Sequence, residues 1–487
     1  MIVLSLTSCG GEKKLHLTAK EGEPANGFVW ENNYDVITIT GYTGSDNKLV
    51  VPETINKKNV TTIAEGAFSG FSGMESVVLP KTLTSIESNA FKDCAMLKTV
   101  EWNAVECTFP EEASGDDESS EGAGNPVFAN CDALETVKFG KGVKSIPGYA
   151  FQGCSGLKTI HLNDGLESIG FSAFGNTDLS DIKIPSTVKS IGGVAFLSAV
   201  TGDAIELTLP AALEDMLGNP FAGCNISHIR MGGENEKFYA EGDCLIDKEY
   251  GSVYIGCSNS QIPADGSIRS IAPLACFGVK GLGTLDLPDS ITSIGICAFE
   301  FSELEKITLP AGIAKIEDET FNGCSKLTNV TFKGAVGSIG KSAFSDCSSL
   351  KNVVFQNKSG GVFDGEVMLD DGAFQNCSSL TSFDMKITTV PNFVFQGCSS
   401  LEKVSLGTLC NEIGNFAFDG CRKLHITLKD FTHTVGWYAF RNCGDVDFDS
   451  YYDWYMTSTD GYKKKYTGYW VDGNTFQVYD DYKWTIS

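Results

Sequence analysis

Fifteen phenylalanines recur along this chain at intervals that are mostly 21 to 23 residues long. They are Phe68, Phe91, Phe128, Phe151, Phe174, Phe196, Phe221, Phe277, Phe299, Phe321, Phe344, Phe374, Phe395, Phe418 and Phe440. Such spacing indicates one small supersecondary unit repeated many times rather than several unrelated domains. A unit this short cannot bury its own apolar face, so each copy must stack on its neighbours. The sequence therefore predicts a solenoid.

The composition supports a folded body and restricts its partners. Of the 487 residues, 42% are hydrophobic, which is ample for a core and excludes wholesale disorder. The formal net charge is −25. A chain this acidic repels phosphate backbones, so we expect no nucleic acid partner.

The cysteines follow the same repeat. Ten of the seventeen lie three residues after a repeat phenylalanine: Cys94, Cys131, Cys154, Cys224, Cys324, Cys347, Cys377, Cys398, Cys421 and Cys443. This predicts an internal ladder with one thiol per turn, in which parallel side chains disfavour the roughly 90° disulfide torsion. We therefore expect reduced ladder thiols, and Cys244 with Cys257 is the first pair to test for a bridge. No zinc-binding spacing appears and the five histidines do not cluster, so we expect no metal site and no cofactor.

The residue before each ladder cysteine is always glycine, asparagine or aspartate. The ten residues are Asp93, Asn130, Gly153, Gly223, Gly323, Asp346, Asn376, Gly397, Gly420 and Asn442. These types tolerate a left-handed backbone, so we predict a turn with φ above zero at each position. A substitution such as Gly397→Val is expected to destabilise one turn by roughly 1–3 kcal/mol.

Each repeat reads as two short strands and a turn. Residues 157–162 alternate like a strand with one buried side, and elsewhere the same strand stops at a proline, as in Leu287-Pro288. A brief second strand follows, such as residues 291–294, and then a tight helical turn that carries Ala-Phe. The expected fold is a β-rich α/β solenoid with short strands and short helical turns.

The recurring pattern Ile-x(3)-Ala-Phe-x-Gly/Asn/Asp-Cys-Ser-x-Leu-x-x-Val-x-Leu-Pro-x-x-Val-x-Ser-Ile resembles the BspA-type leucine-rich repeat. Residues 347–350 and 398–401, both Cys-Ser-Ser-Leu, match it closely, and the resemblance covers roughly residues 35–444. It implies a curved, right-handed leucine-rich repeat superhelix on a bacterial cell envelope. It also implies surface adhesion and binding of host or extracellular-matrix proteins, with no catalytic residues.

The start of the chain resembles a bacterial lipoprotein signal. The apolar residues 1–6 run into Leu6-Thr7-Ser8-Cys9, an aliphatic and two small residues before a cysteine that would become acylated. We interpret residues 1–27 as a signal remnant and tether with lipidation at Cys9. No later segment has 18 or more apolar residues, so the predicted protein is held to the membrane by its lipid alone, at the outer membrane and cell surface or facing the periplasm.

The repeat is flanked by a different sequence at each end and is interrupted by two insertions. We predict an N-terminal capping repeat at 28–63 and the solenoid at 64–444, with an acidic loop at 107–126 and a hairpin insertion at 225–270. Residues 445–487 lack the Ala-Phe unit and are rich in tyrosine and tryptophan, which predicts a β-rich C-terminal cap. Exposed aromatic residues also favour sugar and protein contacts, so the candidate ligand contacts are Trp454, Tyr455, Trp470 and Trp484.

We find no nucleophile elbow, zinc-protease helix or phosphate-binding loop, so the predicted protein is not an enzyme. The leading interpretation is a non-catalytic envelope protein that recognises a protein partner through its strand face. The alternative is a glycan-binding surface lipoprotein that uses the aromatic C-terminal region. The outward strand positions are Lys98, Glu101, Lys158, His161, Lys183, Lys306, Thr308, Asn329, Thr331, Lys351, Asn352, Lys403 and Ser405.

Overall fold

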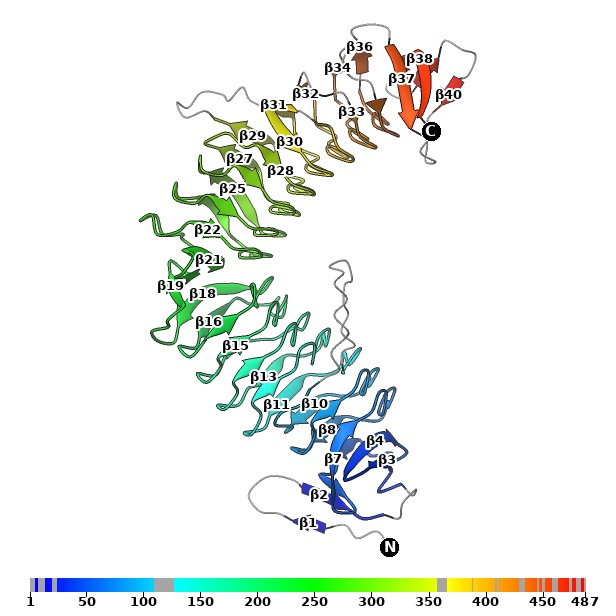
Figure 1. Cartoon of the computed structure of the whole chain (residues 1–487), viewed down its shortest axis with the longest axis vertical. Coiled ribbons are helices and arrows are strands. Elements are labelled where there is room, and N and C mark those ends of the chain that lie inside the picture. The colour runs from blue at the N-terminus through cyan, green and yellow to red at the C-terminus, as the bar shows by residue number, and fades with distance from the viewer. Residues whose placement is uncertain are drawn as a thin grey trace. The chain divides into compact units, whose positions relative to one another are not determined.

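The computed structural model of the chain is built from β-strands (Figure 1). It describes residues 5–7, 14–19, 24–108, 127–356, 366–387, 389–407, 410, 412–428, 434–444, 446–448, 452–457, 463–472, 475–478 and 483–485. None of these residues forms a helix, so none forms a helix long and apolar enough to cross a membrane. The chain divides into two compact units, Met1–Tyr239 (unit 1) and Ala240–Ser487 (unit 2), which we describe one at a time.

The first strands of unit 1 form two parallel sheets. One consists of β5 (Lys48–Val50), β8 (Ser76–Leu79), β10 (Thr99–Trp102), β11 (Thr136–Phe139) and β13 (Thr159–His161), and the other of β16 (Ile205–Leu209) and β18 (Ile226–Met231). The register aligns Val77, Val100 and Val137, all fully buried, so equivalent residues form one inward row. Alternation along each strand sends its other side chains to the opposite face.

A second row of parallel strands forms another face of unit 1. Its members are β7 (Lys58–Ile63), β9 (Ser85–Ile86), β12 (Ser145–Ile146), β14 (Ser168–Ile169), β15 (Ser190–Ile191) and β17 (Asp215–Met216), and all of them except β7 have only two residues. The isoleucines of β12, β14 and β15 are in register and buried. Each coil of unit 1 therefore contributes two strands and one connecting turn.

Unit 2 repeats this plan. Its first strands are β23 (Gly283–Asp286), β25 (Leu304–Leu309), β27 (Asn329–Phe332), β29 (Asn352–Phe355), β31 (Ser382–Ile387), β32 (Lys403–Leu406), β34 (Ile426–Leu428) and β36 (Val446–Phe448). Its second strands are β22 (Ser270–Ile271), β24 (Ser293–Ile294), β26 (Lys315–Ile316), β28 (Ser338–Ile339), β30 (Glu366–Leu369), β33 (Glu412–Ile413) and β35 (Thr434–Val435). Over both units the coils form a β-solenoid, as the repeat predicts.

The insertion predicted at 225–270 is shorter than expected. Residues 226–231 form β18, a regular first strand that pairs in parallel with β16, because their apolar alternation continues the repeat. The hairpin itself consists of β20 (Cys244–Asp247) and β21 (Ser252–Ile255), which pair antiparallel, and β19 (Phe238–Glu241) precedes them. Strand β21 also pairs in parallel with β22, so the hairpin joins the row of second strands.

A continuous stack of phenylalanine rings fills the core of each unit. In unit 1 the rings from Phe68 to Phe221 follow one another at 4.9–5.6 Å and lie within 14° of parallel. In unit 2 the rings from Phe299 to Phe440 do the same at 5.0–5.7 Å. These rings are almost completely buried, so the repeat residues form the core as predicted.

The assignment of Phe277 to this stack is wrong. The backbone N–H of Cys276 donates to Ala298 O at 2.7 Å, the bond that a core phenylalanine makes in other coils, and the Cys276 side chain is buried. Phe277 is only half-buried and packs edge-on against Phe301 at 5.7 Å. A one-residue offset moves the ring from the inner to the outer side of the turn, and a thiol takes the core position.

The short helical turns expected around Ala-Phe are not confirmed. In the described residues these segments are successive turns with i→i+3 bonds, such as Cys154 N to Phe151 O at 3.2 Å. Two left-handed residues interrupt them, one two residues before the core phenylalanine and one two residues after it, such as Tyr149 (φ 59°) and Gly153 (φ 74°). A helix cannot run through a left-handed residue, so the segment stays a chain of turns. All ten residues predicted to have φ above zero do so.

The turns of neighbouring coils are joined by a second backbone ladder. The N–H groups of Tyr149, Phe151 and Gly153 donate to carbonyl oxygens of the next coil, each at 2.8 Å. Thus alternate residues of the turn bond between coils, and the left-handed residues are part of that ladder.

The thiol ladder has a specific hydrogen-bonding role. Each of the ten ladder thiols donates to the carbonyl oxygen of the core phenylalanine in the preceding coil, as in Cys347 Sγ to Phe321 O at 3.1 Å. The structure has all sixteen cysteines of the described segments, Cys244 and Cys257 included, as free thiols. Burial raises the pKa of the Cys154 thiol to about 12 and that of Cys224 to about 11.

Strands lie at both ends of the chain. The N-terminal strands are β1 (Ser5–Thr7), β2 (Lys14–Leu17), β3 (Phe28–Asn33), β4 (Val36–Tyr42) and β6 (Thr54–Ile55), and the C-terminal ones are β37 (Tyr452–Thr457), β38 (Lys463–Asp472), β39 (Thr475–Val478) and β40 (Lys483–Thr485). β3 pairs antiparallel with β4, and β37 to β40 form an antiparallel meander. The capping role of 28–63 and 445–487 stays a prediction. Cys9 and residues 109–126 of the acidic loop lie outside the described residues.

Candidate functional site

The outward face of the first strands is a polar surface that the repeat generates. All thirteen residues predicted to point outward along these strands are exposed or half-exposed. In unit 1 the register aligns Glu101, Lys138 and His161 in one row across β10, β11 and β13, and all three are exposed. Adjacent strands lie about 4.8 Å apart, so neighbouring coils present their side chains at nearly regular intervals.

A groove of about 290 Å³ opens where these strands end in unit 1. It is lined by Val51, Glu53, Val78, Leu79, Pro80, Lys81, Glu101, Asn103, Val105, Gly140, Lys141 and Gly142. Four of these side chains are charged, two of each sign, and none is fully buried. A Cβ at Gly140 would lie 2.2 Å from Asn103 Oδ1, so a side chain there would displace Asn103. The groove suits a polar segment that carries charges of both signs.

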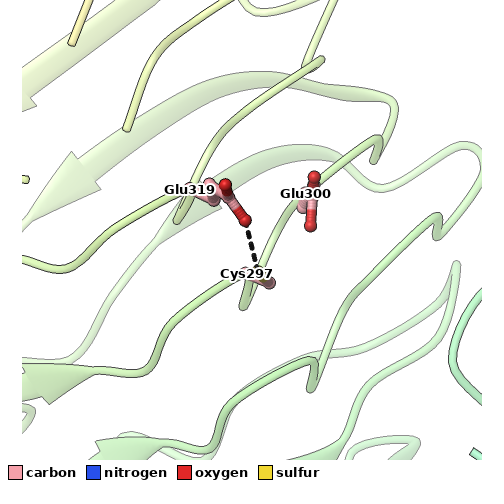
Figure 2. Close-up of side chains that lie close together, drawn as sticks. All are labelled: Cys297, Glu300 and Glu319. Carbon is pink, nitrogen blue, oxygen red and sulfur yellow. Dashed lines mark hydrogen bonds between the residues drawn. The ribbon is translucent and has the colours of Figure 1, made fainter. Parts of the chain in front are cut away.

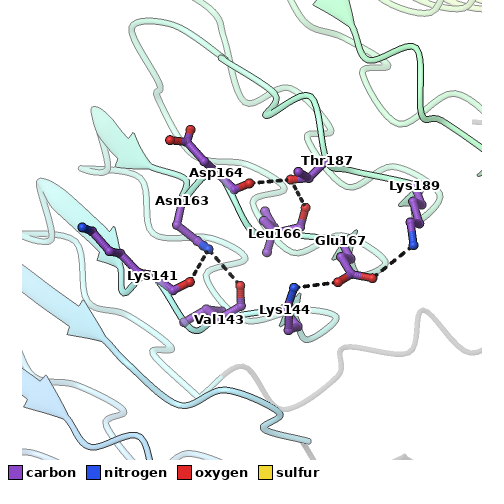
Figure 3. Close-up of polar contacts among 9 residues, drawn as sticks. All are labelled: Lys141, Val143, Lys144, Asn163, Asp164, Leu166, Glu167, Thr187 and Lys189. Carbon is purple, nitrogen blue, oxygen red and sulfur yellow. Dashed lines mark hydrogen bonds and ion pairs between the residues drawn. The ribbon is translucent and has the colours of Figure 1, made fainter.

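The neighbouring face of unit 1 carries an ion-pair row (Figure 3). Glu167 accepts from Lys144 at 2.7 Å and from Lys189 at 3.3 Å, and these hydrogen bonds hold the pKa of its carboxyl below the ordinary value. Beside it, Asn163 Nδ2 donates to Lys141 O at 3.3 Å and to Val143 O at 3.0 Å. These contacts join successive coils and leave the charged side chains exposed to solvent. Exposed ion pairs contribute little to stability, so the row is a surface feature and not a main support of the coils.

Unit 2 brings together three potential metal ligands, Cys297, Glu300 and Glu319 (Figure 2). Their ligand atoms all lie within 4.8 Å of one another. Cys297 Sγ lies 3.4 Å from Glu319 Oε2, and Asn322 Nδ2 donates to Glu300 Oε1 at 2.9 Å. Burial, aided by both carboxylates, raises the pKa of the Cys297 thiol, and burial raises the pKa of Glu300.

Unit 2 also has a surface row of aromatic residues. Phe393 and Phe416 stack at 5.3 Å, and Tyr438 follows Phe416 at 5.3 Å. The guanidinium of Arg441 lies 4.9 Å from the Tyr438 ring centre and forms an ion pair with buried Asp419 at 2.6 Å. Each aromatic residue lies two positions before a core phenylalanine, the position that Cys297 and Glu319 also occupy. The aromatic row and the ligand cluster were not predicted from the sequence, although comparing this one position from repeat to repeat would have indicated both.

The predicted C-terminal contact residues lie in strands. Trp454 and Tyr455 are in β37, Trp470 is in β38 and Trp484 is in β40. The register places Trp454 opposite Tyr466, Trp470 opposite Phe476, and Phe476 opposite Trp484. These aromatic positions are therefore neighbours in one sheet, and their role in ligand contact stays a prediction.

Comparison with known proteins identifies the repeat. The family model described as "BspA type Leucine rich repeat region" matches in six copies over residues 47–113, 123–241, 250–362 and 367–447, which make up most of the chain. No curated protein matches the chain.

The chain is also similar to solved structures of other proteins. A leucine-rich repeat protein from Eubacterium ventriosum is 18% identical with a TM-score of 0.55, over 81% of this chain and 91% of its own. A leucine-rich repeat protein from Bacteroides ovatus is 20% identical with a TM-score of 0.42, over 88% and 100%. A leucine rich cell surface protein from Faecalibacterium prausnitzii is 21% identical with a TM-score of 0.40, over 89% and 94%. The similarity to the Eubacterium ventriosum protein shows a shared fold.

Proposed function

The chain belongs to the BspA-type leucine-rich repeat family, and on that premise we propose that it is a non-catalytic protein that recognises another protein through the outward face of its first strands. The observation that carries the proposal is the in-register row Glu101, Lys138 and His161 beside the charged groove in unit 1. Solenoids use such extended surfaces for binding because each coil adds side chains to the same face.

The chemistry of this face favours a protein partner over a small molecule. Small-molecule sites are concave and mostly apolar, whereas this groove carries charges of both signs and adjoins an open strand face. Charges of both signs set the orientation and rate of protein association when a partner presents the complementary pattern. A partner would therefore contact several coils at once, and single contacts would contribute unequally to its affinity.

Charge reversal on two different faces tests the proposal. Lys138→Glu and Glu101→Lys change the strand face, and Lys189→Glu is the matched control on the face of the second strands. Purified protein is tested by surface plasmon resonance against immobilised collagen, fibronectin and laminin. We expect at least one of these ligands to bind, with about tenfold weaker affinity for the strand-face variants, which corresponds to about 1.4 kcal/mol, and unchanged affinity for the control. Equal binding by all three variants would remove the strand face from the interface.

We propose further that the protein is anchored to the cell envelope by a lipid on Cys9. The support is the lipobox-like sequence before Cys9 and the polar residues that follow it. Expression of the wild type and of Cys9→Ala, followed by detergent phase partition, tests the anchor, which predicts that only the wild type enters the detergent phase. Protease treatment of intact cells then separates the two orientations, since a chain facing the periplasm stays intact.

The aromatic C-terminal sheet supports the glycan alternative. Trp470, Phe476 and Trp484 occupy directly opposed positions in β38, β39 and β40, and aromatic side chains are frequent contacts of sugars. The paired variant Trp470→Ala and Trp484→Ala on a glycan array tests this function, with far-ultraviolet circular dichroism to verify folding. Glycan binding that persists in the folded variant excludes the C-terminal sheet as the glycan site.

A further inference from the structure

We infer that Cys297, Glu300 and Glu319 form a zinc-binding site in unit 2. Cys297 and Glu319 occupy the same place in two successive coils, two residues before Phe299 and Phe321. Glu300 follows Phe299 directly, and Figure 2 shows Glu300 and Glu319 on either side of Cys297. Their ligand atoms converge within 4.8 Å. Zinc bonds to sulfur and oxygen are about 2.0–2.3 Å long, so small rotations of the glutamate side chains would bring all three atoms onto one ion.

The backbone ladder between the two coils preorganises these ligands. The N–H groups of Cys297, Phe299 and Phe301 donate to carbonyl oxygens of the next coil, at 3.3, 2.9 and 2.8 Å. Both Cys297 and Glu319 have φ of 55°, so their side chains leave the backbone in the same direction. The two side chains are thus held as neighbours by the solenoid itself, and binding an ion requires little ordering of the backbone.

An independent observation is the state of Glu300. Its residue is only 8% exposed, and no lysine or arginine of the described segments forms an ion pair with Glu300 or with Glu319. The neutral amide of Asn322 donates to one carboxylate oxygen and fixes its orientation, as outer-shell partners of metal ligands do, but supplies no charge. Buried charged carboxylates are normally paired with a cation or coordinate a metal. In the part of the chain that the structure describes, Glu300 has no cationic side chain beside it, and a bound metal ion would supply the missing positive charge.

The donor set selects zinc among the common divalent ions. Calcium and magnesium take oxygen ligands, usually six or more, whereas this site offers one sulfur and two carboxylates. Zinc accepts sulfur and carboxylate ligands in a tetrahedral arrangement, and three protein ligands leave a fourth position for water or for a group of a partner. Binding would release the proton of the Cys297 thiol and leave the ion held by a thiolate and two carboxylates.

Metal analysis of the purified full-length chain tests the site. The protein is treated with a chelator, dialysed against a small excess of Zn²⁺ or Ca²⁺ in separate experiments, and analysed by inductively coupled plasma mass spectrometry. We expect about one zinc ion per chain above the content of Cys297→Ser, Glu300→Gln and Glu319→Gln, and no such difference for calcium. Replacing zinc by Co²⁺ should give a sulfur-to-cobalt charge-transfer band that Cys297→Ser loses.

Matched controls separate this site from adventitious binding to an acidic, thiol-rich protein. Glu317→Gln removes a carboxylate from the same turn, and Cys443→Ser removes another half-exposed thiol, so both should keep the zinc and the cobalt band. Melting curves verify that each variant is folded, and the two glutamate variants test the site without Cys297→Ser if that variant unfolds. Equal zinc content in the wild type and in the folded site variants, or a cobalt band that persists in Cys297→Ser, would overturn the inference.

Discussion

Two glycines of unit 1 should respond to the same substitutions with losses of stability of different size and different cause. Gly153 has φ of 74°, and a Cβ placed there meets no atom within 4 Å. Gly170 lies outside the left-handed region, but a Cβ there would lie 2.3 Å from the Gly148 nitrogen and 2.7 Å from its Cα. The first glycine is needed for its backbone conformation and the second for the close approach of two coils.

The structure sets the size of each effect. Gly153→Ala should cost about 1–2 kcal/mol, the strain of a non-glycine residue in the left-handed region. Gly153→Asn should cost less, because asparagine tolerates this region and already occupies the equivalent positions Asn130 and Asn376 with φ of 58° and 59°. Gly170→Ala should cost more than about 3 kcal/mol, since backbone atoms must separate and the 2.8 Å bond from Gly170 N to Ile146 O weakens.

Local hydrogen exchange is the appropriate assay, because long repeat arrays need not unfold in one step. Mass spectrometry of peptides that cover residues 146–170 should show exchange about tenfold faster in Gly153→Ala and more than a hundredfold faster in Gly170→Ala, at about 1.4 kcal/mol for each factor of ten. Peptides of unit 2 serve as the internal reference. If Gly153→Asn is as damaging as Gly170→Asn, or if Gly170→Ala is harmless, the distinction between the two glycines is wrong.

Three further predictions follow from the core, the thiols and the surface charges. Phe344→Ala should destabilise unit 2 by about 3–5 kcal/mol through the cavity that it leaves in the ring stack. Phe277→Ala should cost much less. If the two variants lower the urea midpoint by similar amounts, the assignment of Cys276 to the core is wrong. Burial raises the pKa of the Cys224 thiol from 9.0 to about 11. The contribution of this thiol to stability is therefore complete below pH 9 and is lost as the pH rises to about 11. Urea titrations between about pH 8 and 11 should show this decline in the free energy of unfolding, and Cys224→Ala should make the decline shallower. Glu167→Gln should leave the melting temperature unchanged, because both of its lysine partners are exposed and screened by solvent; a clear drop would mean that this ion-pair row stabilises the coils.

The parts of the fold that depend on one residue type at one position were predictable from sequence. Spacing alone identified fourteen of the fifteen proposed core rings. The Gly, Asn or Asp before each ladder cysteine identified ten left-handed residues, and the structure confirms all ten. Each inference used a local requirement, either burial of a large ring or a backbone that few residue types tolerate. Such requirements leave a visible pattern because substitutions there carry a direct energetic cost.

The errors arose where the backbone departs from what residue types indicate. Tyr149, Val194 and Leu274 are left-handed although none of these types favours that conformation, so the second interruption of each turn was not visible and a helical turn was expected. The offset at Phe277 was missed because the sequence also offers a phenylalanine one residue after the core position. Backbone hydrogen bonds between coils determine both the left-handed residues and the offset at Phe277. The sequence of a single repeat does not show which residues make these bonds.

The candidate metal ligands were not predictable from spacing. Cys297 and Glu319 are 22 residues apart, a separation that matches no metal-binding motif and has meaning only once the coils are stacked. The repeat itself converts this separation into contact, because residues one period apart become neighbours. A search of successive repeats for ligand types at one shared position would have found the pair.

That shared position, two residues before each core phenylalanine, explains where this solenoid can carry function. Its left-handed backbone costs on the order of 1–3 kcal/mol for a residue other than glycine, yet the chain places Cys297, Glu319, Phe393 and Phe416 there. The ladder between the turns holds this conformation whatever the side chain is, so the position is rigid in its backbone and unrestricted in its chemistry. In unit 2 this position supplies two of the three residues of the proposed zinc site and all three rings of the aromatic row. Function on this scaffold should therefore be sought along the turns as well as on the strand face.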